Sequence, residues 1–393
     1  MQKLGLTCGL LLLCLFAGWR TRAQLIYYNT SSATTSMNTL QNVATNGTGK
    51  TTLLIATGVD GNKLNRCTAV AVDALNGKLF LIDGAANALW SVNLDGSGLA
   101  LVKSGLTSFP TDLALDVQNK KIYYSTSSTI QNNNTVQQMD YTGNNNTSLF
   151  VATGTPPDNA LSRCTAIAVD VKNGKIFVAD AGARRIWSIS LAGGGLVALT
   201  APTNSTPTDL ALDVSNQQVY FTLSSSVQSS NLIQRVNYDG SGLITLFAAS
   251  GGLQRCTALD LDLAHDNIYL SDAGANSLWR IPISGGSATP VLSGLTATAK
   301  KVRWFSGAGT GTGTPPPFIS GINLSGTNVI FNGTNGLTGG TYYVLTSTNL
   351  TLPFSQWSLL STNVLGTGGN FTITATNALI PNAPQQFYIL QVH

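Results

Sequence analysis

The chain has 393 residues, of which 21 are Lys or Arg and 17 are acidic, so its formal charge is +4. Charged residues make up only 10% of the chain and apolar residues 43%, which excludes an intrinsically disordered protein. The length allows two or three domains. So weak a charge gives no reason to expect nucleic acid or an anionic membrane as a partner.

The first 23 residues have the pattern of a secretory signal peptide. Lys3 precedes a continuous apolar run over residues 4–17, which is too short to span a bilayer comfortably. Small residues, Thr21 and Ala23, then occupy positions −3 and −1 of a cleavage site after Ala23. Cleavage there removes three basic residues and lowers the formal charge from +4 to +1. We therefore expect a secreted protein, extracellular or at the cell surface, without a transmembrane segment.

Two sequence motifs alternate along the chain. The segment Arg-Cys-Thr-Ala-Val-Ala-Val-Asp at 66–73 recurs in closely similar form at 163–170 and 255–262. Between these copies, Pro-Thr-Asp-Leu-Ala-Leu-Asp occurs at 110–116 and again at 207–213. Each motif begins a unit that reads as four short strands separated by turn signals. Four strands at this spacing indicate the blades of a β-propeller.

Five such units are complete and a sixth is divided between two distant segments. Residues 26–30 match 122–126, so the mature N-terminus supplies the second, third and fourth strands of a blade. Residues 301–304 align with 112–115 and supply the missing first strand. We therefore expect an all-β fold, with a six-bladed propeller over residues 24–306 that closes by pairing its two ends. Such pairing removes the open edge of an incomplete ring.

The blades resemble the YWTD repeat, the class B repeat of the low-density lipoprotein receptor family. The resemblance rests on the Asp that ends each first strand and on the aromatic-x-x-Asp of the second strands at 80–83, 177–180 and 269–272. The Trp of the family motif is absent from every second strand, and no cysteine-rich module follows. The resemblance implies the propeller fold, and we do not transfer a receptor role.

A linker and a second domain follow the propeller. Residues 307–317 form a Gly/Thr run that ends in three prolines, which is typical of a linker. Residues 318–393 read as about six short strands and predict a small β-sandwich. This segment is similar to a C-terminal module common in secreted bacterial proteins, which implies an attachment or accessory role.

The inventory of titratable residues argues against most enzyme mechanisms. The chain has no glutamate, and its only histidines are His265 and the terminal His393. A zinc site or a Ser-His-Asp triad needs more imidazoles than these, correctly placed. Most of the aspartates occupy repeated positions, which favours a structural role. We expect no cofactor, no metal and no catalytic residue, although a lactonase-like or lyase-like propeller enzyme remains an alternative.

Three cysteines of the mature chain, Cys67, Cys164 and Cys256, occupy equivalent positions on alternate blades. Positions so far apart around a ring exceed the distance of about 7 Å between Cα atoms that a disulfide allows. We interpret them as three buried thiols that act as small apolar residues. The alternative is a three-thiolate metal site, which requires the sulfur atoms to reach one point.

The best candidate for ligand binding is the opening of the ring where the first strands begin. Six charged residues lie there: Arg66, Arg163, Arg255, Asp112, Asp209 and Lys301. One interpretation is an Arg–Asp network that ties the blades together. The other is a net-positive funnel for an anionic or hydroxylated ligand. The polar loops at 125–134 and 222–230 are expected to flank this opening.

These observations favour a secreted, monomeric, non-enzymatic protein that binds or adheres through one propeller face. The expected ligand is a protein or a carbohydrate. A structural component of the cell envelope is a further alternative.

Overall fold

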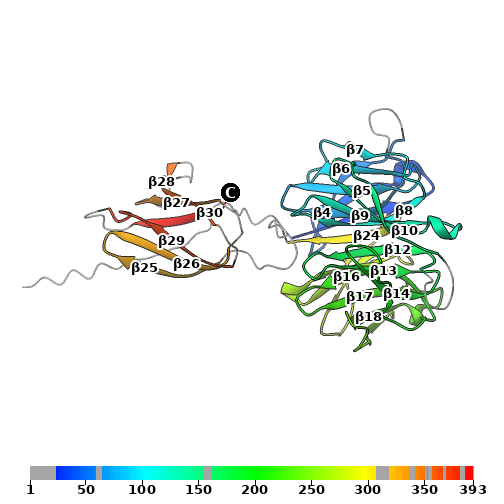
Figure 1. Cartoon of the computed structure of the whole chain (residues 1–393). Helices are drawn as coiled ribbons and strands as arrows, with labels where there is room; N and C mark the ends of the chain where they lie inside the picture. The colour runs from blue at the N-terminus through cyan, green and yellow to red at the C-terminus, as the bar shows by residue number, and fades with distance from the viewer. Residues whose placement is uncertain are drawn as a thin grey trace, which may run out of the picture. The chain divides into compact units, whose positions relative to one another are not determined.

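The computed structural model describes residues 24–58, 64–153, 161–306, 318–336, 341–349, 352, 356–365, 369–380 and 386–392 (Figure 1). Contacts divide the chain into one unit over Ala23–Gly313 and another that includes Thr314–His393, and each is described by itself. The predicted signal peptide at 1–23 and the predicted linker at 307–317 lie outside the described residues. None of the described helices has the length and apolar character needed to cross a membrane.

The first unit contains six four-stranded antiparallel sheets among its described residues. The first sheet contains β1 (Leu25–Ser31), β2 (Thr39–Ala44), β3 (Thr51–Ile55) and, from the far end of the unit, β24 (Thr298–Phe305). The second contains β4 (Cys67–Asp73), β5 (Lys78–Asp83), β6 (Ala88–Asn93) and β7 (Ala100–Lys103), and the third contains β8 (Phe109–Asp116), β9 (Lys121–Ser127), β10 (Thr135–Asp140) and β11 (Thr147–Val151). Three follow: β12 (Cys164–Asp170), β13 (Lys175–Asp180), β14 (Arg185–Ser190) and β15 (Val197–Ala198); β16 (Thr206–Asp213), β17 (Gln218–Ser224), β18 (Leu232–Asn237) and β19 (Ile244–Ala248); β20 (Cys256–Asp262), β21 (Asn267–Asp272), β22 (Ser277–Pro282) and β23 (Thr289–Leu292). Short 3-10 turns lie at Thr35–Met37, Gln131–Asn133, Gln228–Ser230 and Leu263–His265.

The second strand of each sheet is buried on both faces. In β5, for example, Leu79, Leu81 and Ile82 are wholly buried and Phe80 nearly so. A strand that alternated apolar and polar residues would suit a sheet with one wet face. The continuous apolar run therefore requires a neighbouring sheet on each side.

The sheets meet in six apolar cores, each shared by two neighbouring sheets. Tyr27 and Leu40 of the first sheet share one core with Leu81 of the second. Tyr269 and Leu278 of the last sheet share another with Tyr28 of the first. Each sheet therefore packs against the next along the chain, and the sixth packs against the first.

The first sheet combines strands from the two ends of the unit. β24 pairs antiparallel with β1, with Val302 opposite Tyr28 and Trp304 opposite Ile26. In Figure 1 the yellow β24 lies among strands coloured blue to green. The first and last strands of the unit are thus hydrogen-bonded in one sheet.

The repeated aspartates stabilise turns, as their repetition suggested. Asp73 at the end of β4 accepts hydrogen bonds from the backbone and the side-chain amide of Asn76, at 2.9 and 2.8 Å. Asp83 at the end of β5 accepts hydrogen bonds from four backbone N–H groups, including those of Asn65 and Arg66. The same bonds recur in the equivalent sheets, and His265 takes the place of the Asn beside Asp262.

The second unit has two three-stranded sheets among its described residues. One contains β25 (Phe318–Ser325), β26 (Asn328–Gly336) and β29 (Gly369–Ala375), and the other contains β28 (Ser358–Val364), β27 (Thr341–Ser347) and β30 (Phe387–Val392). Phe331 and Ile373 of the first sheet share a buried core with Tyr342, Val344 and Tyr388 of the second.

Candidate functional site

The first strands of all six sheets surround one cavity. These strands are β4, β8, β12, β16, β20 and β24, and each contributes residues from its second half or from the turn that follows. The cavity has a volume of about 260 Å³. Because every first strand ends beside this cavity, all six run in the same direction. We call this end of the unit the turn side and the opposite end, where the strands begin, the start side.

A buried cluster of charged residues lies among these strands between the two ends. Lys301 Nζ is 2.8 Å from Asp112 Oδ2 and 2.5 Å from Asp209 Oδ1. Arg303 adds two longer contacts, each of 3.6 Å, to the other oxygens of Asp112 and Asp209. Both aspartates are wholly buried and Lys301 is 3% exposed. We call these four residues the axial cluster.

The aspartates of the axial cluster also join neighbouring sheets. Asp112 of β8 accepts a 3.1 Å hydrogen bond from the backbone N–H of Ile167 in β12. Asp209 of β16 accepts an equivalent bond from Leu259 in β20. A third aspartate, Asp260 of β20, accepts a 2.7 Å bond from Trp304 N in β24. Each carboxylate therefore links one first strand to the next.

Burial governs the ionisation of this cluster. It raises the pKa of Asp112, against the opposing effects of Lys301 and Arg303. It likewise raises the pKa of Asp260 to about 6, with Arg303 as the main opposing charge. Burial disfavours the charged form of Arg303, but Asp209, Asp112 and Asp260 together raise its pKa. The guanidinium therefore stays charged because carboxylates surround it.

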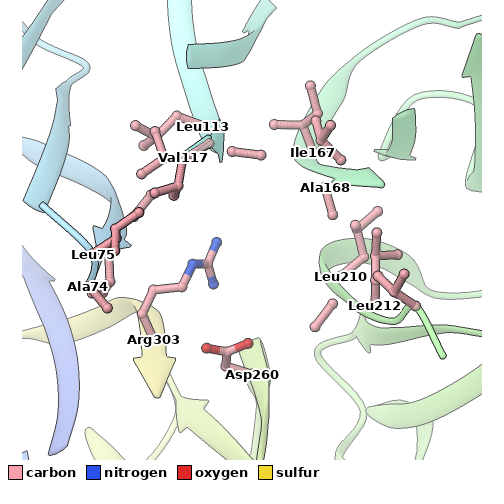
Figure 2. A pocket seen from close by; sticks show the side chains of 17 residues that line it. Ala74, Leu75, Leu113, Val117, Ile167, Ala168, Leu210, Leu212, Asp260 and Arg303 are labelled. Carbon is pink, nitrogen blue, oxygen red and sulfur yellow. The ribbon is translucent and has the colours of Figure 1, made fainter. Parts of the chain in front are cut away.

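Six equivalent positions form a ring that lines the cavity. Each lies opposite the first aromatic residue of its second strand, as Ala71 lies opposite Phe80 and Arg303 opposite Tyr27. The six residues are Ala71, Ala114, Ala168, Ala211, Asp260 and Arg303. The four small alanines leave the space open, and we call these positions the alanine ring. Figure 2 shows Arg303 and Asp260 side by side and pointing into the cavity.

The three predicted arginines lie on the start side, apart from the axial cluster. Arg66, Arg163 and Arg255 each precede a first strand, and their backbone N–H groups donate to Asp83, Asp180 and Asp272. Among the described residues, none of their guanidinium groups forms an ion pair with a carboxylate. The guanidinium of Arg66 instead lies 5.3 Å above the ring of Phe109.

A fourth cation, Lys300, lies near two of these arginines, Arg255 and Arg66. Lys300 lies on β24, which packs between β20 and β4, the strands that follow Arg255 and Arg66. Its pKa is lowered by burial and then by the charges of Arg255 and Arg66. Folding therefore gathers like charges on the start side instead of pairing them with acids.

Arg163 lines a separate pocket on the same side. This pocket has a volume of about 550 Å³, and its other walls include Phe109, Gln131 and Ser162. Gln131 belongs to the polar loop that was expected to flank the opening, and its side chain donates to the Leu161 carbonyl. The start side thus offers cations, hydroxyls and an aromatic face.

The sequence prediction of one six-residue site therefore needs correction. Asp112, Asp209 and Lys301 do meet, but the arginines do not pair with these aspartates, so the proposed Arg–Asp network is wrong. Arg303 and Asp260, which sequence reasoning missed, complete the charged cluster. Both replace an Ala found at the equivalent position of other repeats, and that departure was the available signal.

The cysteines lie in three different cores. Cys67, Cys164 and Cys256 are free, wholly buried thiols, each in the core of a different pair of sheets. Burial raises the pKa of Cys256 to about 12 and raises those of the other two as well. The sulfur atoms do not reach one point, so the three-thiolate alternative is wrong. No group of three or more potential metal-binding side chains gathers within the described ranges.

No model of a protein family matches this chain, and no curated protein matches it. Solved structures, by contrast, do match this chain. A chain from a nidogen/laminin complex is similar over 72% of this chain and 97% of its own length, with 15% identity and a TM-score of 0.58. TolB from Acinetobacter baumannii is similar over 73% of this chain and 67% of its own length, with 13% identity and a TM-score of 0.55. These similarities, together with the six sheets, show a β-propeller fold.

Proposed function

We propose that this protein is a secreted, non-enzymatic binding protein that holds an acidic segment of a protein partner on the start side of its propeller. One observation carries the proposal: Lys300 lies on β24, which packs between β4 and β20, the strands that Arg66 and Arg255 precede, and no described carboxylate pairs with the two arginines. Gathering like charges lowers stability, and such a departure from the best fold is expected at functional sites.

The chemistry of these side chains selects the ligand. A guanidinium presents a planar fork of donors that matches a carboxylate, whereas Lys300 contributes a point charge. The pocket beside Arg163 adds Ser and Gln side chains that can hydrogen-bond a peptide backbone. An acidic peptide would engage both features, because Phe109 lines this pocket and also lies under Arg66.

The proposal includes a finer description of the propeller. We take the six sheets as six blades of one ring, closed by the pairing of β24 with β1. The core that Tyr269 and Tyr28 share across the last and first sheets supports this interpretation. A closed ring would fix the start-side cations relative to one another, as a preformed binding face requires.

The remaining parts of the proposal rest on sequence. The signal-peptide pattern supports secretion after cleavage near Ala23. We take the second unit as a β-sandwich with an accessory or attachment role. A chain of the nidogen/laminin complex provides a precedent for a similar fold in a protein complex.

The test uses a hexa-aspartate peptide, with blocked ends, as the probe. Wild-type protein is expected to bind it by isothermal titration calorimetry and to release it as salt rises from 50 to 500 mM, because ions screen exposed charges. The triple variant Arg66→Ala, Arg163→Ala, Arg255→Ala is expected to bind at least about tenfold more weakly, a change of about 1.4 kcal/mol.

A matched variant controls for the loss of three charges. Lys50→Ala, Lys121→Ala, Lys172→Ala removes the same charge from residues at the opposite end of the strands, on the turn side. It should bind the peptide as the wild type does. Equal binding by the arginine triple variant, in a protein that still unfolds cooperatively, would refute the proposal. Preference for an acidic polysaccharide over the peptide would also refute it, in favour of a carbohydrate ligand.

A further inference from the structure

We infer that the alanine-ring cavity on the turn side is a second, independent binding site, which takes a free α-amino acid with an apolar side chain. In this arrangement Arg303 binds the carboxylate of the ligand, Asp260 binds its ammonium group, and the cavity walls contact its side chain. The site lies on the turn side, includes Arg303 of the axial cluster and uses none of the start-side cations, so it does not depend on the function proposed above.

Two neighbouring positions of the alanine ring carry a residue other than alanine. Four of its six residues are Ala, and the two that are not are adjacent and oppositely charged, Asp260 and Arg303. Alanine satisfies the packing at four of the six positions, whereas Asp260 and Arg303, besides their contacts to Trp304 and to the axial aspartates, bring charge to the cavity. The charged pair therefore adds recognition to a surface that is otherwise apolar.

Arg303 retains hydrogen-bonding capacity toward the cavity. Its Nη1 donates a 2.8 Å hydrogen bond to the Val302 carbonyl. Its contacts to Asp112 and Asp209 are both 3.6 Å, which is longer than a hydrogen bond. A guanidinium has five N–H donors, so several remain for a ligand carboxylate. Figure 2 shows the guanidinium directed toward the middle of the cavity.

The neighbouring opposite charges of Arg303 and Asp260 select a zwitterion over a simple anion or cation. The axial cluster and Asp260 together hold two cations, Lys301 and Arg303, and three carboxylates. A simple anion would lie against the Asp260 carboxylate and a simple cation against the Arg303 guanidinium, and an unpaired like charge at a buried site is costly. An α-amino acid brings both charges on adjacent atoms and leaves the total unchanged. Arg303 and Asp260, which lie side by side, can receive both charges at once.

The walls select an apolar side chain of modest size. Leu113, Ile167 and Leu210 line the cavity beside the alanine ring (Figure 2). Toward solvent the lining continues through Leu75, which is 55% exposed. Ligand pockets in proteins usually start at about 300 Å³. A cavity of about 260 Å³ is therefore at the small end and suits a molecule the size of leucine.

The experiment titrates four small molecules into the full chain by calorimetry at pH 7.5. L-Leucine is expected to bind. Glycine lacks the side chain, N-acetyl-leucine lacks the ammonium group and 3-methylbutylamine lacks the carboxylate, so each should bind at least tenfold more weakly. If leucine causes no heat change up to 10 mM, or if all four compounds bind equally, the proposal is wrong.

Three variants assign the contacts. Asp260→Ala and Arg303→Ala each restore the residue that equivalent blades carry, and cooperative unfolding of both variants is checked first because Arg303→Ala also removes a charge from the axial cluster. Asp260→Ala should weaken leucine binding at least tenfold and change N-acetyl-leucine binding less than threefold. Arg303→Ala should weaken the binding of leucine and N-acetyl-leucine, which both carry the carboxylate, and leave the binding of 3-methylbutylamine unchanged. Ala168→Leu fills the cavity without changing charge and should abolish leucine binding. Should leucine bind unchanged to both Asp260→Ala and Ala168→Leu, the assignment would be overturned, whatever the behaviour of Arg303→Ala.

Discussion

Lys301 Nζ lies 2.5 Å from Asp209 Oδ1, although 92 residues separate them in the sequence. The repeat explains why they meet, because Asp112, Asp209 and Lys301 occupy the same position on three alternate first strands. A third aspartate there would leave three carboxylates with Arg303 as their nearby cation. Lys301 breaks the repeat and, together with Arg303, balances the charges of the other two.

Replacing Lys301 by Met should therefore destabilise the propeller strongly. Removing one partner of a buried ion pair costs about 3–5 kcal/mol, because the remaining charges stay buried without compensation. Urea denaturation of Lys301→Met measures this loss. Adding Asp112→Asn and Asp209→Asn should recover part of it, since neutral amides need no cation. An unchanged denaturation midpoint in the single variant would show that the cluster contributes little.

Stability should fall as pH rises from about 4 to about 6. The pKa of Asp260 is raised to about 6 in the fold, and that of Asp112 is raised as well. An unfolded chain releases these protons near pH 4. Between the two values the folded state binds more protons than the unfolded state, so raising the pH favours unfolding.

Asp260→Ala isolates one part of this pH dependence. Removing the group should reduce the loss of unfolding free energy between pH 4 and pH 7 by on the order of 1 to 3 kcal/mol. The melting temperature should therefore decrease less over this pH range than in the wild type. Asp112, Asp209, Lys301 and Arg303 remain in the variant and account for the rest. A variant whose pH profile matches the wild type would contradict the raised pKa of Asp260.

A pair of glycines tests the packing of the sixth sheet on the first. Gly47 follows β2 at φ +83°, and a Cβ there would collide with the backbone oxygen of Val291 in β23. Gly49 has a similar φ of +65° but open space around it. Ala at a left-handed position costs about 1–2 kcal/mol by itself. Gly47→Ala should therefore cost clearly more than Gly49→Ala in thermal unfolding, whereas equal effects would argue against this contact.

The three cysteines should be chemically inert in the folded protein. Cys67, Cys164 and Cys256 are wholly buried, and burial keeps them in the thiol form, which is not the nucleophile. Iodoacetamide at pH 8 should label none of them in native protein and all three in urea, as counted by mass spectrometry. Labelling of the native protein at any of the three would show that its core opens readily.

The repeat allowed much of the strand order to be predicted, because strands and turns follow local patterns. Residues 301–304 could be aligned with 112–115 since the same residue types recur at the same spacing. The partners of the charged residues could not be predicted in this way. Whether Asp112 meets Arg66 or Lys301 depends on how far each residue lies from the beginning of its first strand in space. The repeat does not define how the first strands are aligned with one another along the axis of the ring. Arg303 and Asp260 stood out only as departures from alanine.

The most direct test of the account measures the binding of two probes to the wild type and to two variants. Hexa-aspartate peptide and L-leucine are titrated into the wild type, the Arg66/Arg163/Arg255 triple Ala variant and Asp260→Ala. The account predicts that the arginine variant loses the peptide and keeps leucine, while Asp260→Ala keeps the peptide and loses leucine. If the arginine variant, still folded, binds the peptide as tightly as the wild type, the central claim of a cationic binding face is contradicted.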